Sequence, residues 1–401
     1  NSTYRFNGGF LNTTTTNATT TNLYTNSLEF QNASGTSATT TNLFARHITT
    51  DNAQALIRAD SKIPLVTSFA MASATGTSTV LTDDRYAVVL HKATDQFTVF
   101  DLTSSTRPVS RGVYSAGDTG LTGGVLQGHL LFLTLSGPKA MRIYDLRDGL
   151  VTFRATLGFT GAPQSIVVQG TYAYVVTGGN TFRIVDVANP DKPREIAAIM
   201  TPGSVPTRLA VAGRYVYITD SATENTYIYE VTDPYHPHVL SGALSSGSAD
   251  VVAQGSYAFV GGALGVDVIN GSIPSSPSVA RYLGVTTTQA MAIYGRYLFL
   301  ATTSTGLQIV DMANVAAPQL VQSIGGITPG GISIRGRYAF VSDARNNSLR
   351  VYRLPGIEAA GIEVGAANIG MLQVLGNGQI GHSLDIGGGL TVGFGGIRSQ
   401  G

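Results

Sequence analysis

Two histidines that flank a proline are the residues best suited to metal chemistry in this chain of 401 residues. His236 and His238 lie on either side of Pro237, and their imidazoles could point the same way and hold a metal ion. A zinc site needs at least three protein ligands, and no third candidate lies nearby in the sequence. The other histidines are scattered, and spacing alone cannot assemble a Ser/His/Asp triad. We therefore predict no metal site.

Carboxylates recur at one place in a repeated unit and at first suggest a ring of ligands. The examples are Asp101, Asp145, Asp186 and Asp311. Because most units are acidic there, we interpret this residue as an acceptor for backbone N–H groups in a turn. Gly376-x-Gly378-x-x-Gly381 matches a dinucleotide-binding fingerprint, but no helical pattern follows it. With no P-loop, no Gly-x-Ser-x-Gly and no His-Glu-x-x-His motif, we predict no enzyme activity and no cofactor.

Composition argues against several other classes of function. The net charge is +1 and only 12% of residues are charged, whereas nucleic-acid binding needs a clustered basic face. The chain has no cysteine, which excludes disulfides and thiolate metal sites. No apolar run approaches the roughly 18 residues of a membrane span. The first residue is Asn1 with no leader before it, and we expect a processed chain or part of a longer one.

Units with a period of about 42 residues, typical of β-propeller blades, fill the sequence from 63 to 355. Each unit supplies four short strands around an anchor, and an aromatic residue or leucine follows the anchor two positions later. The anchors are Asp84, Gly128, Gly170, Gly213, Gly255, Gly295 and Gly336. The strands are short and apolar, so we expect them to be buried on both faces. The sequence therefore predicts an all-β fold with a seven-bladed β-propeller over 63–355.

The two ends of the repeat array predict how the ring closes. The seventh unit lacks a fourth strand after Leu349–Tyr352, whereas Lys62–Val66 matches the fourth strand of another unit at Lys192–Ile196. An open strand edge invites aggregation, and a closed propeller avoids it. We therefore expect the strand at 63–69 to pair with Leu349–Tyr352 and complete the seventh blade.

Two stretches of the third and sixth units carry a family resemblance. Phe182–Val187 reads FRIVDV and Leu307–Met312 reads LQIVDM, and both resemble the LVIVD-repeat family. The resemblance extends over roughly 63–355, although the fifth unit departs from it at Val268–Asn270 and the seventh at Val351–Arg353. It implies a propeller of the kind found in many surface and secreted proteins, and no single activity.

The N-terminal segment predicts a fibrous β-stalk. Residues 1–50 are rich in Thr and Asn, and Ala18–Leu23 returns as Ala38–Leu43. Thr favours strands, but a repeat of about twenty residues with so few apolar groups cannot bury a core by itself. We expect 1–50 to form a β-stalk segment that shares its core with identical chains, followed by a joint over 51–62.

The C-terminal segment, 356–401, predicts a second β-stalk. Its apolar residues recur with a period of six and glycines fill the corners, which is a β-helix signature. The apolar positions are Val374, Ile380, Leu384, Ile386, Leu390 and Val392. The segment resembles the shafts of phage tail fibres and trimeric adhesins. It is too short for a β-helix of one chain, so we expect three chains to share one core in a homotrimer.

The loops between the second and third strands vary most between units, and residues that bind ligands on a rigid scaffold usually lie in such loops. The binding candidates in these loops are Lys92, Asp95, Lys139, Asn180, Asp220, Asn225, Arg345 and Asn346. We expect the ligand to be a surface glycan or a protein receptor.

The sequence thus favours an extracellular structural or adhesive fibre, on a cell surface or a virion, that displays the propeller as a binding or spacer module. One alternative is a propeller enzyme, a lyase or hydrolase of surface glycans, which convergent acidic and histidine side chains at one mouth of the ring would favour. Another alternative is a subunit of a polymeric filament that the flanking segments join.

Overall fold

The computed structural model describes residues 18–25, 28–30, 38–50, 63–71, 78–83, 85–245, 249–263, 265–282, 288–315, 317–354 and 358–364. The joint at 51–62, the anchor Asp84 and the hexad positions from Val374 to Val392 lie outside these residues. In the first three strands and the last, only the backbone is described. The described chain contains no helix long and apolar enough to cross a membrane.

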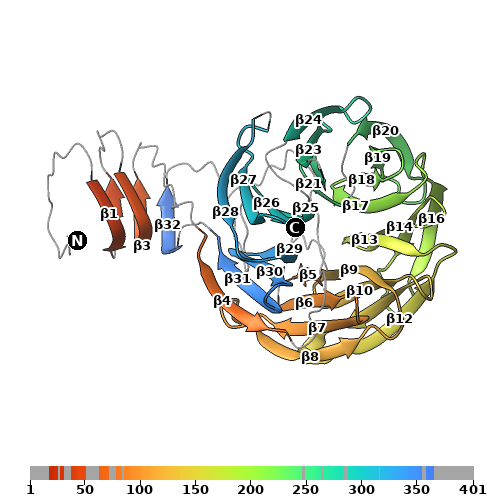
Figure 1. Ribbon diagram of the computed structural model, residues 1–401, viewed down its shortest axis with the longest axis horizontal. Helices are drawn as coiled ribbons and strands as arrows, with labels where there is room; N and C mark the ends of the chain where they lie inside the picture. The colour runs from red at the N-terminus through yellow and green to blue at the C-terminus, as the bar shows by residue number, and fades with distance from the viewer. Residues whose placement is uncertain are drawn as a thin grey trace, which may run out of the picture. The chain divides into compact units, whose positions relative to one another are not determined.

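Seven antiparallel sheets of four strands form a ring in the described chain, which is a seven-bladed β-propeller (Figure 1). From the axis outward, the first three blades are β5 (Ser78–Thr82), β6 (Tyr86–His91), β7 (Gln96–Asp101) and β8 (Val109–Ser115); β9 (Leu121–Gln127), β10 (Leu130–Leu135), β11 (Ala140–Asp145) and β12 (Thr152–Gly158); and β13 (Pro163–Gln169), β14 (Tyr172–Thr177), β15 (Thr181–Asp186) and β16 (Arg194–Met200). A short 3₁₀ turn, η1 (Arg147–Gly149), precedes β12.

The ring continues with four more blades. They are β17 (Pro206–Ala212), β18 (Tyr215–Asp220), β19 (Asn225–Glu230) and β20 (His238–Leu244); β21 (Asp250–Gln254), β22 (Tyr257–Gly262), β23 (Gly265–Asn270) and β24 (Ser278–Tyr282); β25 (Thr288–Tyr294), β26 (Tyr297–Thr302), β27 (Gly306–Asp311) and β28 (Gln319–Ile324); and β29 (Pro329–Arg335), β30 (Tyr338–Asp343), β31 (Ser348–Arg353) and β4 (Leu65–Ala70). The first strands of successive blades pack against one another around the axis, and β29 packs against β5, which closes the circle.

The seventh blade takes its outermost strand from the N-terminal side of the propeller, as the ends of the repeat array predict. β4 pairs antiparallel with β31, with Phe69 opposite Leu349 and Leu65 opposite Tyr352. The pairing ends with a hydrogen bond from the Arg353 N–H to the Pro64 carbonyl oxygen at 3.1 Å. The strand starts at Leu65, two residues after the predicted start at 63, and ends at Ala70, one residue after the predicted end at 69.

Burial follows the position of a strand in its blade. The second and third strands are almost wholly buried, whereas outer strands such as β8 and β16 alternate between exposed and partly buried residues. The expectation of burial on both faces is therefore wrong for the fourth strands, because no other layer of the described chain covers them at the rim of the ring. Prolines stand just before these edge strands, for example Pro193 before β16 and Pro318 before β28, where a missing N–H costs little.

The core lies between the faces of neighbouring blades. Phe182 of the third blade and Tyr229 of the fourth pack with ring centroids 5.1 Å apart, and both side chains are fully buried. The anchor glycines turn the chain between the first and second strands. From Gly128 to Gly336 the six of them have φ between 54° and 61°, a left-handed conformation that glycine adopts without the strain of a side chain.

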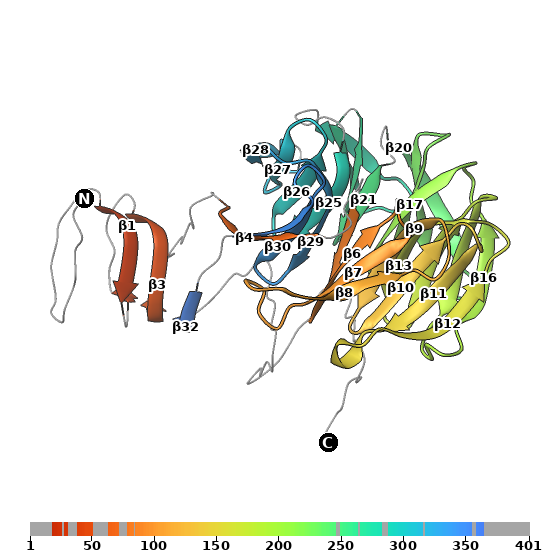
Figure 2. The same cartoon turned by 60° about the horizontal axis from the view of Figure 1, so that its bottom comes forward.

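A separate parallel sheet carries the Thr/Asn-rich repeat (Figures 1 and 2). Its strands are β1 (Ala18–Thr25), β2 (Leu28–Phe30), β3 (Ala38–Thr50) and β32 (Glu358–Val364). β1 and β2 both pair with β3 at a constant shift of 20 residues, with Ala18 beside Ala38 and Leu28 beside Ile48. This register equals the spacing of the repeat in the sequence, so each repeat is one rung of a stack.

β32 adds a third rung to the same stack. Phe44 pairs with both Tyr24 and Glu358, so β32 must lie on the edge of β3 opposite to β1. β32 is also parallel to β3. The 28 strands of the propeller, β4 to β31, come between β3 and β32 in the chain. The propeller is therefore inserted between two neighbouring rungs, and the chain divides into two compact units, one with the rungs and one with the blades.

Candidate ligand site at the axis of the propeller

The predicted binding residues all lie on one face of the ring, which we call the loop face. The start of each first strand pairs with the end of the second, for example Ser78 with His91 and Pro206 with Asp220. The loops between second and third strands therefore surround the starts of the inner strands. This face brings together side chains that lie far apart in the sequence.

Three of the candidates serve the turns that carry them. Asp95, Lys139 and Asn180 have φ of 52°, 52° and 57°, and the carbonyl oxygen of each accepts the N–H of the residue after the fourth strand of its blade at 2.7–2.9 Å. The Asp95 carboxylate also accepts the Leu121 N–H at 2.7 Å. Their repeated position reflects turn geometry, and whether they bind a ligand stays a prediction.

Four further candidates belong to two hydrogen-bonded corners. Asp220 is buried and accepts the N–H groups of Val205, Ala222 and Thr223 at 2.7–3.0 Å. Asn225 beside it donates to the Thr223 carbonyl oxygen at 3.0 Å. In the seventh blade the buried Asp343 accepts the backbone N–H of Arg345, the Asn346 side-chain amide and Arg350 Nε. Both carboxylates hold loops in place.

Replacing Asp343 with alanine is expected to lower the free energy of unfolding by about 3 kcal/mol, because it leaves the half-buried Arg350 guanidinium without its carboxylate. Burial raises the pKa of the Asp343 carboxyl, but hydrogen bonds from Asn346 and the Thr328 N–H outweigh it, so the pKa lies below its ordinary range. Urea unfolding measures the effect. The control is Asp118→Ala, which removes an exposed ion pair to Arg142 and should cost under about 1 kcal/mol; equal losses would contradict this account.

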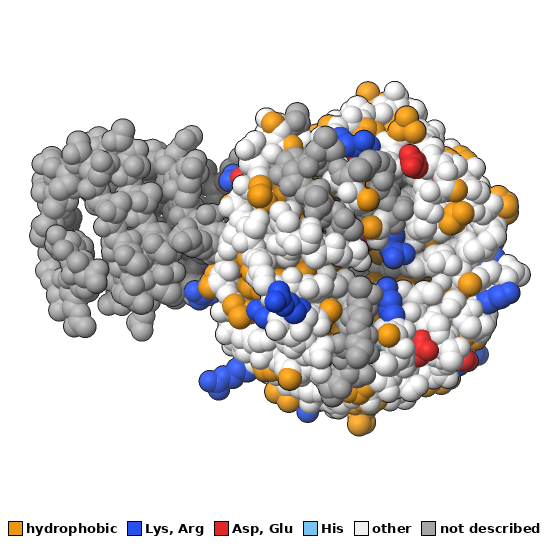
Figure 3. All heavy atoms as spheres, viewed as in Figure 1, with side chains coloured by type: hydrophobic (Ala, Val, Ile, Leu, Met, Phe, Trp, Pro, Cys, Tyr) orange, Lys and Arg blue, Asp and Glu red, His pale blue; other side chains and the backbone are white. Residues whose placement is uncertain are grey.

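Lys92 is the one candidate that interacts with charged groups of other blades. It follows β6 in the first blade, and its partners are Arg208 in β17 and Asp250 in β21, of the fourth and fifth blades. In a ring of seven, the first blade faces the fourth and fifth across the axis. These three side chains, the axial cluster, therefore converge where the inner strands begin. Figure 3 shows basic side chains beside the centre of the face that it draws.

The environment shifts two pKa values in the axial cluster toward neutrality. Burial and, to a lesser extent, the charge of Arg208 lower the pKa of Lys92 to about 8, against the opposing effect of Asp250. Burial raises the pKa of Asp250 to about 6, against the effects of the Met291 N–H and of both cations. Perturbed pKa values of this kind are concentrated at functional sites.

Backbone groups hold Arg208 and Asp250 in place. Arg208 donates from Nε to the Ala249 carbonyl oxygen at 3.1 Å and from Nη1 to the Thr207 carbonyl oxygen at 3.0 Å. Asp250 accepts the Met291 N–H at 2.7 Å and the Val251 N–H at 2.9 Å. The two charged groups are therefore fixed by the fifth and sixth blades before any ligand arrives.

Arg208 and Asp250 were not among the sequence candidates, although the sequence contains a signal for them. Arg208 pairs with Thr219, the second-last residue of β18, and Asp250 pairs with Gly261, the second-last residue of β22. The residues at this position in the other five blades are Thr79, Gly123, Ser165, Ala290 and Gly331. Two adjacent blades thus carry a charge where all the others carry a small uncharged residue.

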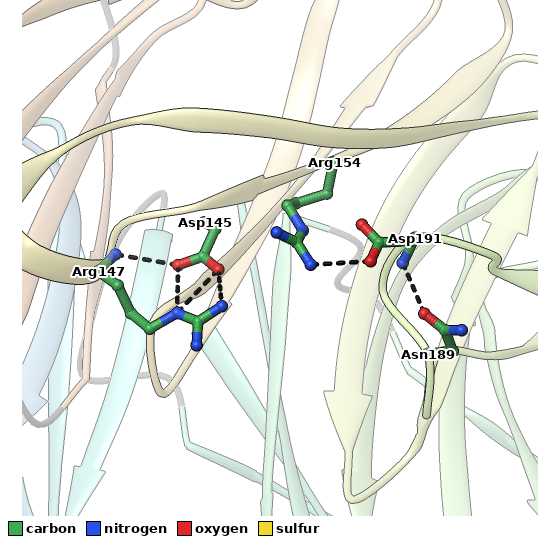
Figure 4. A network of polar contacts seen from close by, with 5 residues as sticks. All are labelled: Asp145, Arg147, Arg154, Asn189 and Asp191. Carbon is green, nitrogen blue, oxygen red and sulfur yellow. Dashed lines mark hydrogen bonds and ion pairs between the residues drawn. The ribbon is translucent and has the colours of Figure 1, made fainter.

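The repeated carboxylates form turns on the opposite face of the ring, as expected. Asp186 and Asp311 each accept the N–H of the residue two positions later, at 3.0 and 2.9 Å. Asp145 accepts the Arg147 N–H and also binds the Arg147 guanidinium (Figure 4). Burial raises the pKa of Asp101, but hydrogen bonds from Thr103 and Arg111 outweigh it and hold the pKa below its ordinary range.

His236 and His238 interact with separate carboxylates. His236 Nδ1 lies 2.7 Å from Asp233 Oδ2, and His238 Nε2 lies 3.4 Å from Glu230 Oε2. Within the described ranges, no group of three His, Cys, Asp or Glu side chains is arranged to hold a metal ion. The absence of a metal site stays a prediction for the chain as a whole.

Three stretches of the propeller match the family model of the LVIVD repeat: residues 160–201, 246–282 and 287–325. These stretches are LVIVD repeats. They coincide with the third, fifth and sixth blades, and they include Val268–Asn270, where we expected a departure from the pattern. Asn270 accepts the Ser272 N–H at 3.0 Å, so an amide oxygen forms the same turn as the carboxylates.

Solved structures share the fold at low sequence identity. A protein of unknown function from Desulfotomaculum acetoxidans is 16% identical, with a TM-score of 0.55 over 64% of this chain and 88% of that one. Hydrazine synthase of Kuenenia stuttgartiensis is 15% identical, with a TM-score of 0.59 over 71% and 97%. The computationally designed Ika8 protein is 10% identical, with a TM-score of 0.53 over 71% and 98%. These likenesses show the fold alone, and no curated protein matches the chain.

Proposed function

We propose that this chain belongs to an extracellular fibre, on a cell surface or a virion, in which the propeller is a binding module set into a β-stalk. The observation that carries the proposal is the parallel pairing of β3 with β32. Two rungs of one stack lie side by side although 307 residues, 51 to 357, separate them in the chain. A stalk that continues on both sides of an inserted domain can display that domain along its length.

The register of the rungs supports a coiled stalk. A straight rung from Ala18 to Phe30 would be about 40 Å long. The chain must return from Phe30 to Ala38, beside Ala18, within eight residues that reach at most about 29 Å. The rungs therefore cannot be straight. A coil of 20 residues that bends and stacks on the next is the geometry of a β-solenoid shaft.

Three copies of the chain are part of the proposal. The hexad positions around Ile380, Ile386 and Val392 lie outside the described residues, and their period and glycine corners favour a core shared around one axis. The described rungs pair within one chain, so their backbone hydrogen bonds need no second copy. We therefore assign the trimer contact to 356–401 and propose a homotrimer that carries three propellers.

We propose no enzymatic turnover for the propeller. A glycan lyase or hydrolase would need convergent acidic and histidine side chains at one end of the ring. Among the described residues, the axial cluster has two cations and a single carboxylate, which suits binding. A surface glycan or a protein receptor remains the proposed class of ligand.

Negative-stain electron microscopy of the native assembly tests the proposed function. We expect thin shafts that carry compact lobes at their sides, because the propeller is inserted between rungs. The loops of the propeller should then be free to meet a ligand. Compact particles without any shaft, from protein whose flanking segments are shown intact by mass spectrometry, would contradict the fibre.

A further inference from the structure

The axial cluster carries an uncompensated positive charge on the loop face. With Asp250 ionised, Lys92 and Arg208 leave a net charge of +1 at the axis. The five equivalent positions in the other blades are uncharged. No residue at these positions offsets the positive charge of the cluster. The charge is neutralised by a single monoanion.

Asp250 does not close an internal ion pair with either cation. Within the described residues, no ion pair with an N–O distance of 4.0 Å or less joins Asp250 to Lys92 or Arg208. Its oxygens accept the N–H groups of Val251 and Met291 instead. The two cations therefore act on each other and on Asp250 at a longer range, and their donors stay available to a ligand.

The remaining donors suit a carboxylate. Arg208 donates from Nε and Nη1 to carbonyl oxygens, which leaves Nη2 and one hydrogen of Nη1 as donors for a ligand. No hydrogen bond joins the Lys92 ammonium to another described residue. The Arg208 guanidinium and the Lys92 ammonium can each donate a charge-assisted hydrogen bond to a carboxylate that enters between them.

We propose that Lys92 and Arg208 bind the carboxylate of an acidic sugar in a surface glycan, and that Asp250 sets the charge of the site. The assignment rests on the proposed function, because an extracellular fibre meets glycans. One negative charge matches the net charge of the cluster, which favours a carboxylate over inorganic sulfate or a phosphate dianion. The glycan enters on the loop face, where the inner strands begin.

Isothermal titration calorimetry with the full chain at pH 7 tests the site. The probes are D-glucuronate, an oligosaccharide that ends in glucuronate, D-glucose and sulfate. We expect the oligosaccharide to bind more tightly than free glucuronate, and glucose and sulfate to bind at least tenfold more weakly. Tighter binding of sulfate, or binding of the free acid alone, would overturn the assignment to an acidic sugar.

Variants identify the residues. Arg208→Gln and Lys92→Gln should each weaken binding of the oligosaccharide about tenfold or more, as expected for one lost charge-assisted contact. Arg208→Lys should retain part of the affinity. The matched control is Lys192→Gln, an exposed lysine in the turn before β16 on the opposite face, which should change the affinity less than twofold. Equal losses in the control and the two axial variants would overturn the site, provided that their thermal unfolding matches the parent.

The same titration at two pH values separates binding from a structural role. Below about pH 6 Asp250 becomes neutral and the net charge rises to +2; above about pH 8 Lys92 loses its proton and the net charge falls to zero. Arg208 also acts on both pKa values. Glucuronate should therefore bind several-fold more tightly at pH 5.5 than at pH 8.5. The reverse order would overturn the proposal, whereas loss of the fibre in micrographs would overturn the proposed function instead.

Discussion

Deletion of residues 1–70 is expected to abolish the cooperative unfolding of the propeller. The truncation removes β4, so β31 presents an open edge where Phe69 now faces Leu349. It also removes apolar contacts, since Phe69 packs on the buried cluster of Phe340, Leu349 and Val351. A ring whose last blade lacks its outer strand loses closure as well as area, and an open edge favours aggregation.

Deletion of residues 1–50 is the matched control. It removes β1, β2 and β3 of the parallel sheet and leaves β4 and the buried Ile63 in place. We expect this shorter deletion to keep a sharp thermal transition, followed by circular dichroism, at a temperature close to that of the full chain. The closure of the ring by β4 is wrong if both truncated proteins melt as sharply and as high as the full chain.

Replacing Ile386 with aspartate is expected to split the proposed trimer into single chains. The prediction follows from the hexad period of 372–392, which gives each chain the same apolar face toward one axis. Three carboxylates at one level of a dry core repel one another and lose their water, a cost that side-chain contacts cannot offset. Light scattering should report one chain mass of 41.8 kDa for the variant and three times that mass for the parent.

The thermal transition of the propeller provides the control for Ile386→Asp. It should not change, because the substitution lies outside β4 to β31. Ser383→Asp, which is off the hexad positions, should keep the trimer. A monomeric mass for the unmodified chain, with its flanking segments still protected from protease, would refute the trimer.

The sequence predicted the repeated parts of this fold well because repetition makes weak local signals add. Each anchor glycine alone is a common turn signal, but six at one spacing specify blades, and their φ values between 54° and 61° give the physical reason. The closing strand was predictable because a missing strand at one end of the array matched a surplus strand at the other. The exposure of the outer strands was missed because their sequences do not reveal it. The sequence of β16, for example, is as apolar as those of the buried strands.

The candidate site was harder to predict because it depends on which blades face each other. Lys92 is separated from Arg208 and Asp250 by more than a hundred residues, and only the closed ring of seven places the first blade opposite the fourth and fifth. Loop composition identified Lys92 but also residues such as Asp95 and Asn180, whose types are those that left-handed turn positions prefer. A charged residue at a position where most other blades carry a small residue, such as Arg208, is a better signal of a functional site.

The insertion of the propeller between two rungs of a stalk is tested most directly by a disulfide across β3 and β32. The chain has no cysteine, so the double variant Ala45→Cys, Ala359→Cys contains only the introduced pair. The two residues are register partners, and neighbouring strands lie about 4.8 Å apart, within the range of a disulfide.

After mild oxidation, we expect a disulfide within one chain, identified by peptide mass spectrometry and by a reduction-sensitive shift of the monomer band in gel electrophoresis. The off-register pair Ala45→Cys, Glu363→Cys should oxidise far more slowly, because four residues along a strand add about 13 Å. Crosslinking only between chains, or equal crosslinking of both pairs, would contradict the insertion.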